Sequence, residues 1–276
     1  MGVRAKCGTL IYLLLMDKNK YPVYIISKGR YEKTLTADRF ESYGIDYLIA
    51  VEPQEYDLYC KKLGANRVLK LPFSNLGLGS YPARNYCWEH AKAKGYKYHW
   101  LFDDNITDFK KWINQKRQII REYIPALKYV EHYSEKNGID ISGFEEPNFC
   151  IKPPKKPFKT NCHVYSAMLI KNDLPYRWRL KYNEDIDLCL QVLHNGGSTA
   201  SCVYYMVNKI DTGQKMKGGN QTELYQNNAP KKNLLKAKML EAVWPQYTKT
   251  VIRFGRHHHL INWKVFNKKK VIEPPF

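Results

Sequence analysis

The first hundred residues alternate between short apolar runs and segments of helical length, and this alternation is the strongest constraint on the fold. The apolar runs occupy residues 22–26, 46–51, 68–71 and 97–103. Segments with the length and composition of helices lie between them, at residues 32–43, 54–63 and 82–93. Ser80 is a candidate N-cap for the third of these helices. Short strands that alternate with helices indicate βαβ units, so we predict an α/β fold with a mainly parallel sheet.

The second half of the chain is less regular. We expect a long amphipathic helix over residues 117–137 and a proline-rich loop over residues 152–157. A further strand is expected over residues 163–170, and a helix over residues 183–193 with carboxylates at its start. These elements predict an α+β portion that follows the α/β half.

The chain is strongly basic, with 45 Lys and Arg residues against 26 Asp and Glu residues, a net charge of +19. Residues 151–181 hold eight basic residues and one acid, Asp173, with the aromatic residues Tyr176 and Trp178 among them. Residues 249–270 hold seven basic residues and no acid. Two local blocks fit contact with a polyanion such as nucleic acid better than general solubility does. An anionic membrane surface or a solvated lysine-rich surface would carry similar charge.

The cysteines and the N-terminus bear on the compartment. The seven cysteines are odd in number and irregularly spaced, so they do not form a disulfide framework, and no CxxC pair suggests structural zinc. We therefore expect a reducing, cytoplasmic setting. Residues 10–16 form an apolar run too short to span a bilayer. We read residues 1–20 as an extension, with an extra strand before the domain as the alternative, and expect no membrane partner.

The apolar run at residues 97–103 ends abruptly in Asp103, Asp104 and Asn105. Open α/β sheets bind their ligands at the carboxyl ends of strands, where these side chains would offer oxygen ligands. Mg²⁺ and Mn²⁺ take such ligands and commonly share them with a substrate phosphate. A capped turn after a strand would show the same local sequence, so only the context of the motif separates the two interpretations.

Two helix starts carry residues suited to phosphate or proton chemistry. Arg84 and Asn85 lie at the start of the helix predicted after residue 81, where free amides and a guanidinium group suit a phosphate. An ordinary loop that enters a helix would look alike. Glu184 and Asp185 open the helix predicted at residue 183, and either could take a proton from an acceptor hydroxyl as a general base. The helix dipole alone also favours acids there.

Two late segments are weaker signals. Gly218 and Gly219 permit unusual backbone angles and the close approach of a ligand, or belong to a surface loop. His257, His258 and His259 cannot all face one site because successive side chains diverge. One or two of them could join carboxylates around a metal, which would suit Mn²⁺ somewhat better than Mg²⁺. A basic cluster that contacts phosphate is the alternative.

The order of these segments resembles the layout of GT-A glycosyltransferases, with a nucleotide-binding half, an acidic strand end, an acidic helix start and a late histidine. Five segments resemble the TET-associated glycosyltransferase family more narrowly, at residues 22–30, 100–106, 182–188, 217–220 and 255–263. Members of that family occur largely in phages and glycosylate hydroxymethylated pyrimidines in DNA. One departure is that the acidic motif reads Asp-Asp-Asn and not a plain Asp-x-Asp, which leaves open which of its residues binds metal.

The resemblance, which covers roughly residues 21–266, implies a Rossmann-like GT-A fold. It implies one domain over residues 21–276, with a nucleotide-sugar-binding half at 21–106 and an acceptor-binding and DNA-binding half at 107–276. It also implies Mn²⁺ or Mg²⁺, a UDP-sugar as the donor, and hydroxymethylated DNA, chiefly with 5-hydroxymethylcytosine, as the acceptor. If the chain is encoded by a phage, the expected location is the host cytoplasm.

Residue roles follow from the resemblance together with the chemistry of each side chain. Asp185 is the first choice as general base and Glu184 the second. The residues expected to contact the donor are Ser27, Arg30, Glu52, Arg84, Asn85, Asp103, Gly218 and Gly219. The metal ligands are expected among Asp103, Asp104, Asn105, His258 and His259. The residues expected to contact DNA, with Tyr176 and Trp178 as stacking groups, are Lys155, Lys156, Lys159, Arg177, Trp178, Arg179 and Arg256.

Three other functions are compatible with the same residues. The first is a GT-A enzyme that acts on a polysaccharide, lipid or protein. The second is a metal-dependent nuclease that uses Asp103, Asp104 and the histidines, and such an enzyme would nick DNA without a sugar donor. The third is a non-catalytic DNA-binding protein, whose DNA affinity would survive Asp103→Ala and Asp185→Ala.

Overall fold

The computed structural model describes residues 19–210, 218–219 and 232–267, which form a large sheet with helices on both faces. The strands of this sheet are β1 Val23–Ile26, β2 Leu48–Val51, β3 Val68–Lys70, β4 Tyr98–Asp103, β5 Ile106–Ile113, β6 Lys116–Ile120, β7 Ile141–Glu145, β8 Phe158–Thr160, β9 Ala167–Lys171 and β10 Thr199–Lys209. The helices are α2 Leu35–Ser42, α3 Tyr56–Leu63, α4 Tyr81–Ala93, α5 Tyr123–Asn137, α6 Glu184–His194 and α7 Lys232–Val243. A separate two-stranded ribbon consists of β11 Thr248–Arg253 and β12 Arg256–Ile261.

The strand order of the sheet is β3-β2-β1-β4-β9-β7-β10-β5-β6, with β8 paired to β10. Strands β1 to β4 are mutually parallel and are joined through α2, α3 and α4, which confirms the predicted α/β class. The second half of the sheet is mixed, because β9 is antiparallel to both β4 and β7 while β10 is parallel to β7. Strand order reverses between β1 and β4, which opens a crevice at their carboxyl ends.

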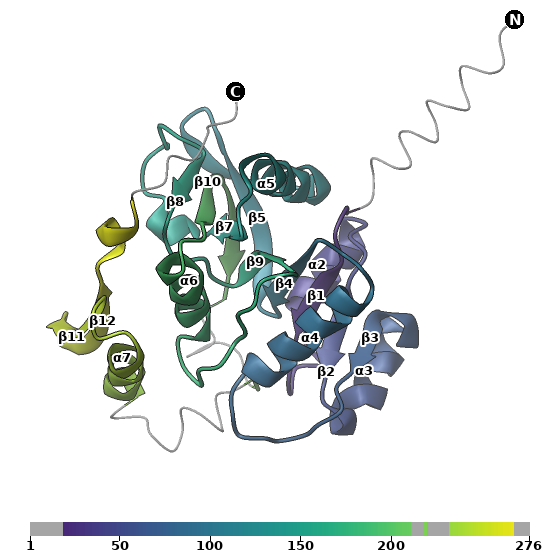
Figure 1. The fold of residues 1–276 in the computed structure, drawn as a ribbon. Coiled ribbons are helices and arrows are strands. Elements are labelled where there is room, and N and C mark those ends of the chain that lie inside the picture. Colours follow the sequence, from purple (N-terminus) through teal and green to yellow (C-terminus); the bar gives the residue numbers. More distant parts are fainter. Residues whose placement is uncertain (1–18, 211–217, 220–231, 268–276) are drawn as a thin grey trace, which may run out of the picture.

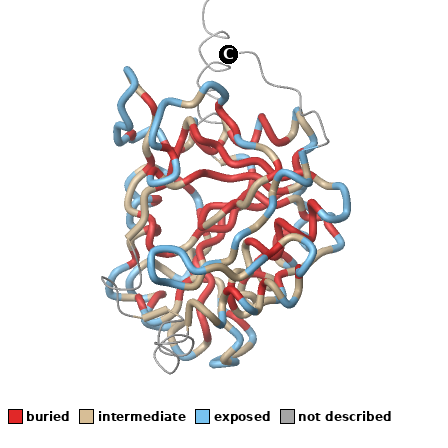
Figure 2. Tube along the Cα trace, turned by 90° about the vertical axis from the view of Figure 1, so that its left-hand side faces the viewer, coloured by how far each residue is buried: buried red, intermediate tan, exposed pale blue. Residues whose placement is uncertain are grey.

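Side chains that alternate along each strand build one core on each face of the sheet. Helices flank the sheet (Figure 1), and much of the chain in the interior of the molecule is buried (Figure 2). Trp100 and Phe102 of β4 point to the face covered by α2, α3 and α5, where Phe40 and Tyr123 pack. Leu101 points to the opposite face, which α4 and α6 cover. Because these strands are buried on both faces, they read as continuous apolar runs, and this is why the sequence predicted them.

Three predicted elements differ from the structure. Residues 117–120, expected to be helical, belong to β6 of an antiparallel hairpin with β5, and the helix begins only at Tyr123. The strand expected from residue 163 begins at Ala167, because Ser166 has a φ of 55° and cannot continue an extended strand. Ser80 precedes α4 at the N-cap position, as predicted, but it has helical backbone angles and its side chain makes no capping hydrogen bond.

Helix α7 and the ribbon lie at one side of the molecule, beyond α6 (Figure 1). Leu240 and Trp244, at the end of α7 and just after it, pack with Ile186 and Leu190 of α6 and with Ile261 of β12. The apolar run at residues 10–16 lies outside the described residues. No helix within the described ranges is long and apolar enough to cross a membrane.

Glu131 on α5 yields a prediction about stability. It accepts a hydrogen bond from Trp100 Nε1 at 2.8 Å, its second carboxylate oxygen has no hydrogen-bond partner in the described part of the chain, and burial raises its pKa to about 7. A glutamate in the unfolded chain ionises near pH 4.5, so the folded state loses stability as pH rises from about 4.5 to 7. Glu131→Gln should therefore stabilise the protein by about 1–3 kcal/mol at pH 8.5 and have little effect at pH 4.5.

Urea unfolding at the two pH values measures this difference. Glu135→Gln, one turn later on α5, is the matched control with the opposite expected sign. Burial alone would raise the pKa of Glu135, but its bonds to Lys20 and Tyr21 lower it, so its contribution is present at pH 8.5 and lost in acid. An equal destabilisation of Glu131→Gln at both pH values would contradict the prediction.

Candidate functional site

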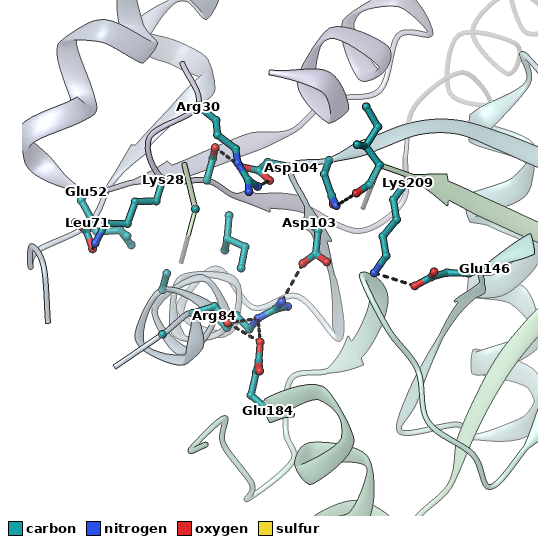
Figure 3. A pocket seen from close by; sticks show the side chains of 18 of the residues that line it. Lys28, Arg30, Glu52, Leu71, Arg84, Asp103, Asp104, Glu146, Glu184 and Lys209 are labelled. Atoms are coloured by element: carbon teal, nitrogen blue, oxygen red, sulfur yellow. Dashed lines mark hydrogen bonds and ion pairs between the residues drawn. The ribbon is translucent and has the colours of Figure 1, made fainter. Parts of the chain in front are cut away.

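A pocket of 430 Å³ opens where the strand order reverses, at the carboxyl ends of the parallel strands (Figure 3). Its walls come from the segments after β1, β2 and β3, the end of β4 and the starts of α4 and α6. The predicted site residues that line it are Ser27, Arg30, Glu52, Arg84, Asp103, Asp104, Asn105, Glu184 and Gly219. Residues from both halves of the chain therefore meet in one cavity.

Arg84 is the centre of the charge network in this pocket. Its side chain is 6% exposed, and its guanidinium lies 2.9 Å from Asp103 and 3.6 Å from Glu184. The guanidinium also stacks on the ring of Trp178, 4.7 Å from its centroid. Burial alone would lower the pKa of Arg84, but Asp103, Glu184 and Asp185 raise it. One buried cation thus joins the acidic strand end to the acidic helix start.

Asp103 and Asp104 have different surroundings although they are adjacent. Asp103 is 26% exposed on the pocket side, and Arg84 and Lys209 outweigh burial and lower its pKa. Asp104 is 6% exposed, with one oxygen bound by Arg30 and the other by the Ser27 hydroxyl at 2.6 Å. Burial raises the pKa of Asp104. Asp103 is therefore the carboxylate available to a ligand, while Asp104 fixes the turn after β1.

A divalent cation fits this pocket only in part. Asp103 offers a carboxylate, and Asn105 on the pocket wall has a buried Oδ1 with no hydrogen-bond partner among the described residues. Both are oxygen ligands of the kind that Mg²⁺ and Mn²⁺ take, with a substrate phosphate completing the shell. Across residues 19–210, 218–219 and 232–267, no group of three or more His, Cys, Asp and Glu side chains converges on a metal position. A metal would thus depend on the substrate for much of its coordination.

Glu184 and Asp185, the first two residues of α6, have different surroundings. Glu184 lines the pocket and accepts a 2.6 Å hydrogen bond from the Ser80 hydroxyl, in place of the expected cap. Asp185 accepts a 2.8 Å bond from the backbone N–H of Ile186. Burial, followed by the charge of Glu184, raises the pKa of Asp185 to about 7. A carboxylate with this pKa can hold or release a proton near neutral pH.

The glycine pair closes the pocket beside the first strand. Gly219 donates its N–H to the Lys28 carbonyl at 2.7 Å, and the Gly218 carbonyl accepts from Arg30 at 3.3 Å. Both glycines have positive φ, at 80° and 70°, and a Cβ on Gly218 would collide with the backbone of Gly29. The pair therefore permits close approach of two chain segments, and Gly219 also faces the pocket.

Lys209 and Glu146 are pocket residues that the sequence analysis missed. Lys209, at the end of β10, lies 2.8 Å from Glu146 and donates to the Ser166 hydroxyl at 2.7 Å. Burial would lower the pKa of Lys209, but Asp103 and Glu146 raise it, so it remains a cation on the pocket wall. The rule that selected Asp103, a polar residue where an apolar strand ends, could have selected Lys209 as well.

Other predicted residues lie outside the pocket. His258 and His259 belong to β12 and do not line the cavity with Asp103. Asn85 uses its amide on the backbone of Trp178, donating at 2.8 Å and accepting at 3.0 Å. Trp178 is 1% exposed, so the expected stacking of its ring on a base is wrong for this structure. Tyr176 is only partly buried and packs against the same core.

Three of the predicted DNA contacts are paired with acids. Arg177 contacts Glu89 at 2.6 Å, and Arg179 contacts Asp187 at 3.0 Å. Lys159 lies 3.2 Å from Glu145. Lys155 and Lys156 lie on the exposed proline-rich loop, and Arg256 begins β12 on the surface. Arg177 and Arg179 thus tie the segment between β9 and α6 to α4 and α6.

The glycine pair yields a prediction about the pocket wall. The family resemblance implies a UDP-sugar as the donor. If UDP binds here, Gly218→Ala should weaken its affinity at least tenfold, because the added Cβ would displace the Lys28–Arg30 turn. Gly44→Ala is the control, since Gly44 has a similar φ of 68° but meets nothing within 4 Å. Isothermal titration with UDP compares the two variants with the wild type. Wild-type UDP affinity in Gly218→Ala would show that the pair does not shape the pocket.

Comparison with known proteins identifies the family. A search of curated proteins finds no match. Among solved structures, a putative nucleotide-diphospho-sugar transferase from Desulfovibrio desulfuricans is similar at 13% sequence identity and a TM-score of 0.40, over 83% of this chain and 98% of that one. A likeness of that size does not indicate a shared function. A family model described as TET-Associated Glycosyltransferase matches residues 21–219. Because this match covers more than half of the 276 residues, the chain belongs to the TET-associated glycosyltransferase family.

Proposed function

We propose that this glycosyltransferase moves a sugar from a UDP-sugar to the hydroxymethyl group of a modified pyrimidine in DNA, with 5-hydroxymethylcytosine as the first candidate. The observation that carries the proposal is the single pocket in which Asp103 and Glu184 lie on either side of Arg84. Asp103 comes from the parallel half of the sheet and Glu184 from α6 in the second half. Such a pocket can hold a donor on one side and an acceptor on the other.

The nucleotide is assigned to the crevice at the ends of β1, β2 and β3. Ser27 and Glu52 line this part of the pocket, and Lys28 lies 3.1 Å from Glu52. Burial would raise the pKa of Glu52, but hydrogen bonds from Gln54, Asn75 and Lys28 lower it. An ionised carboxylate of this kind can accept hydrogen bonds from a ribose or a base.

The diphosphate is assigned to the space between Asp103, Arg84 and Lys209. Arg84 and Lys209 supply buried positive charge on the pocket wall, which favours a leaving group that gains negative charge. Asp103 and Asn105 are the residues that would hold Mn²⁺ or Mg²⁺. A bound metal would add further positive charge for the departing diphosphate.

Asp185 is assigned as the general base. The acceptor hydroxyl oxygen forms a bond to the anomeric carbon, the bond from that carbon to the diphosphate breaks, and Asp185 takes the hydroxyl proton. A base that acts near neutral pH needs a pKa near 7, which burial and Glu184 give to Asp185. Glu184 is the second choice. It lines the pocket, which Asp185 does not, but its charge is paired with Arg84 at 3.6 Å.

A transfer assay tests the proposal. The protein is incubated with Mn²⁺, a panel of UDP-sugars and an oligonucleotide that contains 5-hydroxymethylcytosine, and the nucleosides are weighed after digestion. We expect a hexose or pentose mass gain on the modified cytosine and none on unmodified cytosine. Asp103→Asn should remove the product, whereas Asp173→Asn, an exposed carboxylate outside the pocket, should retain it.

The alternative activities give different outcomes in the same assay. Transfer to a polysaccharide, lipid or protein without any mass gain on DNA would replace the acceptor in the proposal. Plasmid nicking that needs metal but no sugar donor would replace transfer with hydrolysis of DNA.

The pKa of Asp185 gives a pH prediction. The reactive form is the deprotonated carboxylate, so kcat/KM should rise with pH and level off above about 7. Glu184→Gln removes a negative charge that raises this pKa, so it should move the rising limb to lower pH. Asp185→Asn should lower kcat about 10²–10⁴-fold at every pH. A Glu184→Gln enzyme that is as inactive as Asp185→Asn would assign the base to Glu184 instead.

A further inference from the structure

The β11–β12 ribbon is a basic surface element that the pocket does not use. Its register pairs Lys249 with Leu260, Val251 with His258, and Arg253 with Arg256 across the strands. Side chains of directly paired residues point to the same face of an antiparallel ribbon. One face of the ribbon thus carries Lys249, Val251, Arg253, Arg256, His258 and Leu260. The three consecutive histidines divide between the two faces, with His258 on this face and His257 and His259 on the other.

This face is mostly exposed and is called the outer face, and its basic side chains are not paired with acids in the described part of the chain. Residues 248–261 contain no Asp or Glu. Lys249, Arg253 and Arg256 form no ion pair with any residue that the structure describes. The nearest acid that the structure ties to the ribbon, Glu241 of α7, accepts from the Thr250 hydroxyl at 2.7 Å and pairs with Lys238 at 2.8 Å. The outer face is therefore complementary to a polyanion.

An aromatic ring occupies the tip of the ribbon. Phe254 and Gly255 form the two-residue turn, with φ of 50° and 70°, the pattern of a type I′ hairpin that favours Asn or Gly at both positions. Phe254 is 91% exposed between two arginines. Neither turn geometry nor core packing explains a phenylalanine there, whereas stacking on nucleic-acid bases would bury its ring.

Helix α7 lies beside the ribbon (Figure 1) and is hydrogen-bonded to the residue before α6. The Lys236 carbonyl of α7 accepts a 2.8 Å hydrogen bond from Asn183, the residue before Glu184. On the ribbon side, Glu241 of α7 accepts a hydrogen bond from Thr250 of β11. Six-residue strands extend the ribbon about 20 Å from its base to its tip. The ribbon is thus tied through α7 to the residue that precedes Glu184 at the start of α6.

We propose that the β11–β12 ribbon lies in the major groove of double-stranded DNA, where Arg253 and Arg256 contact phosphates and Phe254 stacks in the space left by the extruded target base. This inference rests on the proposed function and names its substrate as duplex DNA. The major groove admits a two-stranded β-ribbon, and substituents at C5 of a pyrimidine project into it. A base must leave the stack before an enzyme can act on it in a deep pocket.

Binding measurements test the phosphate contacts. Arg253→Gln/Arg256→Gln should weaken duplex binding at least tenfold at 150 mM salt and reduce the slope of log K against log salt by about 2. The control is Lys92→Gln/Lys94→Gln, which removes the same charge from exposed residues at the opposite end of α4 from the pocket. Control affinity should stay within twofold of the wild type. An unchanged slope in the ribbon variant, or an equal loss on single-stranded DNA, would overturn the proposal.

A second variant tests the role of the ring. Phe254→Ala should lower kcat/KM at least tenfold for a paired target and restore it when the target lies opposite an abasic site, where extrusion is already easy. A 2-aminopurine beside the target should brighten with the wild type and stay dark with the variant. Leu58→Ala, an exposed apolar residue on α3, is the control and should match the wild type. Equal loss on paired and abasic targets would overturn the role of Phe254.

The two proposals fail separately. If the wild type transfers sugar to DNA and the ribbon variants bind and react as the wild type does, the ribbon inference alone is wrong. If no sugar is transferred to DNA, the proposed function is wrong, and the salt slope and the 2-aminopurine signal still decide whether the ribbon reads duplex DNA.

Discussion

The pocket depends on one buried cation, the guanidinium of Arg84. It lies between Asp103 and Glu184 and rests on the buried ring of Trp178. Three carboxylates come together around it, since Asp185 also raises its pKa. Without the cation these acids would repel one another, and leaving a buried charge without its partner costs about 3–5 kcal/mol. Arg84 therefore allows α6 to approach the end of β4, and through that approach it joins the two halves of the chain.

Much of the α/β half could be predicted because its strands are buried on both faces. Continuous apolar runs such as residues 98–102 have one plausible structure when helical segments alternate with them. The hairpin of β5 and β6 was missed because four of the five residues in β6 are exposed and include good helix formers such as Lys116 and Arg117. Pro125 was the available signal, since a proline is tolerated only in the first turn of a helix and α5 begins at Tyr123.

The candidate site was predictable where a strand end or helix start carried several polar residues in a row. Asp103 and Glu184 were found in this way, and both line the pocket. The local sequence does not indicate which residues these side chains contact. Asp104 is bound by Arg30, and Asn85 is bound by the backbone of Trp178. These pairings join residues separated by 74 and 93 positions. Only the packing of the whole sheet determines them.

The contact between Gly219 and Lys28 has a consequence for how the protein is made. The two residues close one wall of the pocket although about 190 positions separate them, and Lys209 and Glu184 complete other walls. A ribosome releases the parallel half of the sheet first, and that half alone has an open crevice with unpaired walls. The pocket is complete only after residue 219 has emerged. Chains that end before residue 219 therefore lack one wall of the pocket.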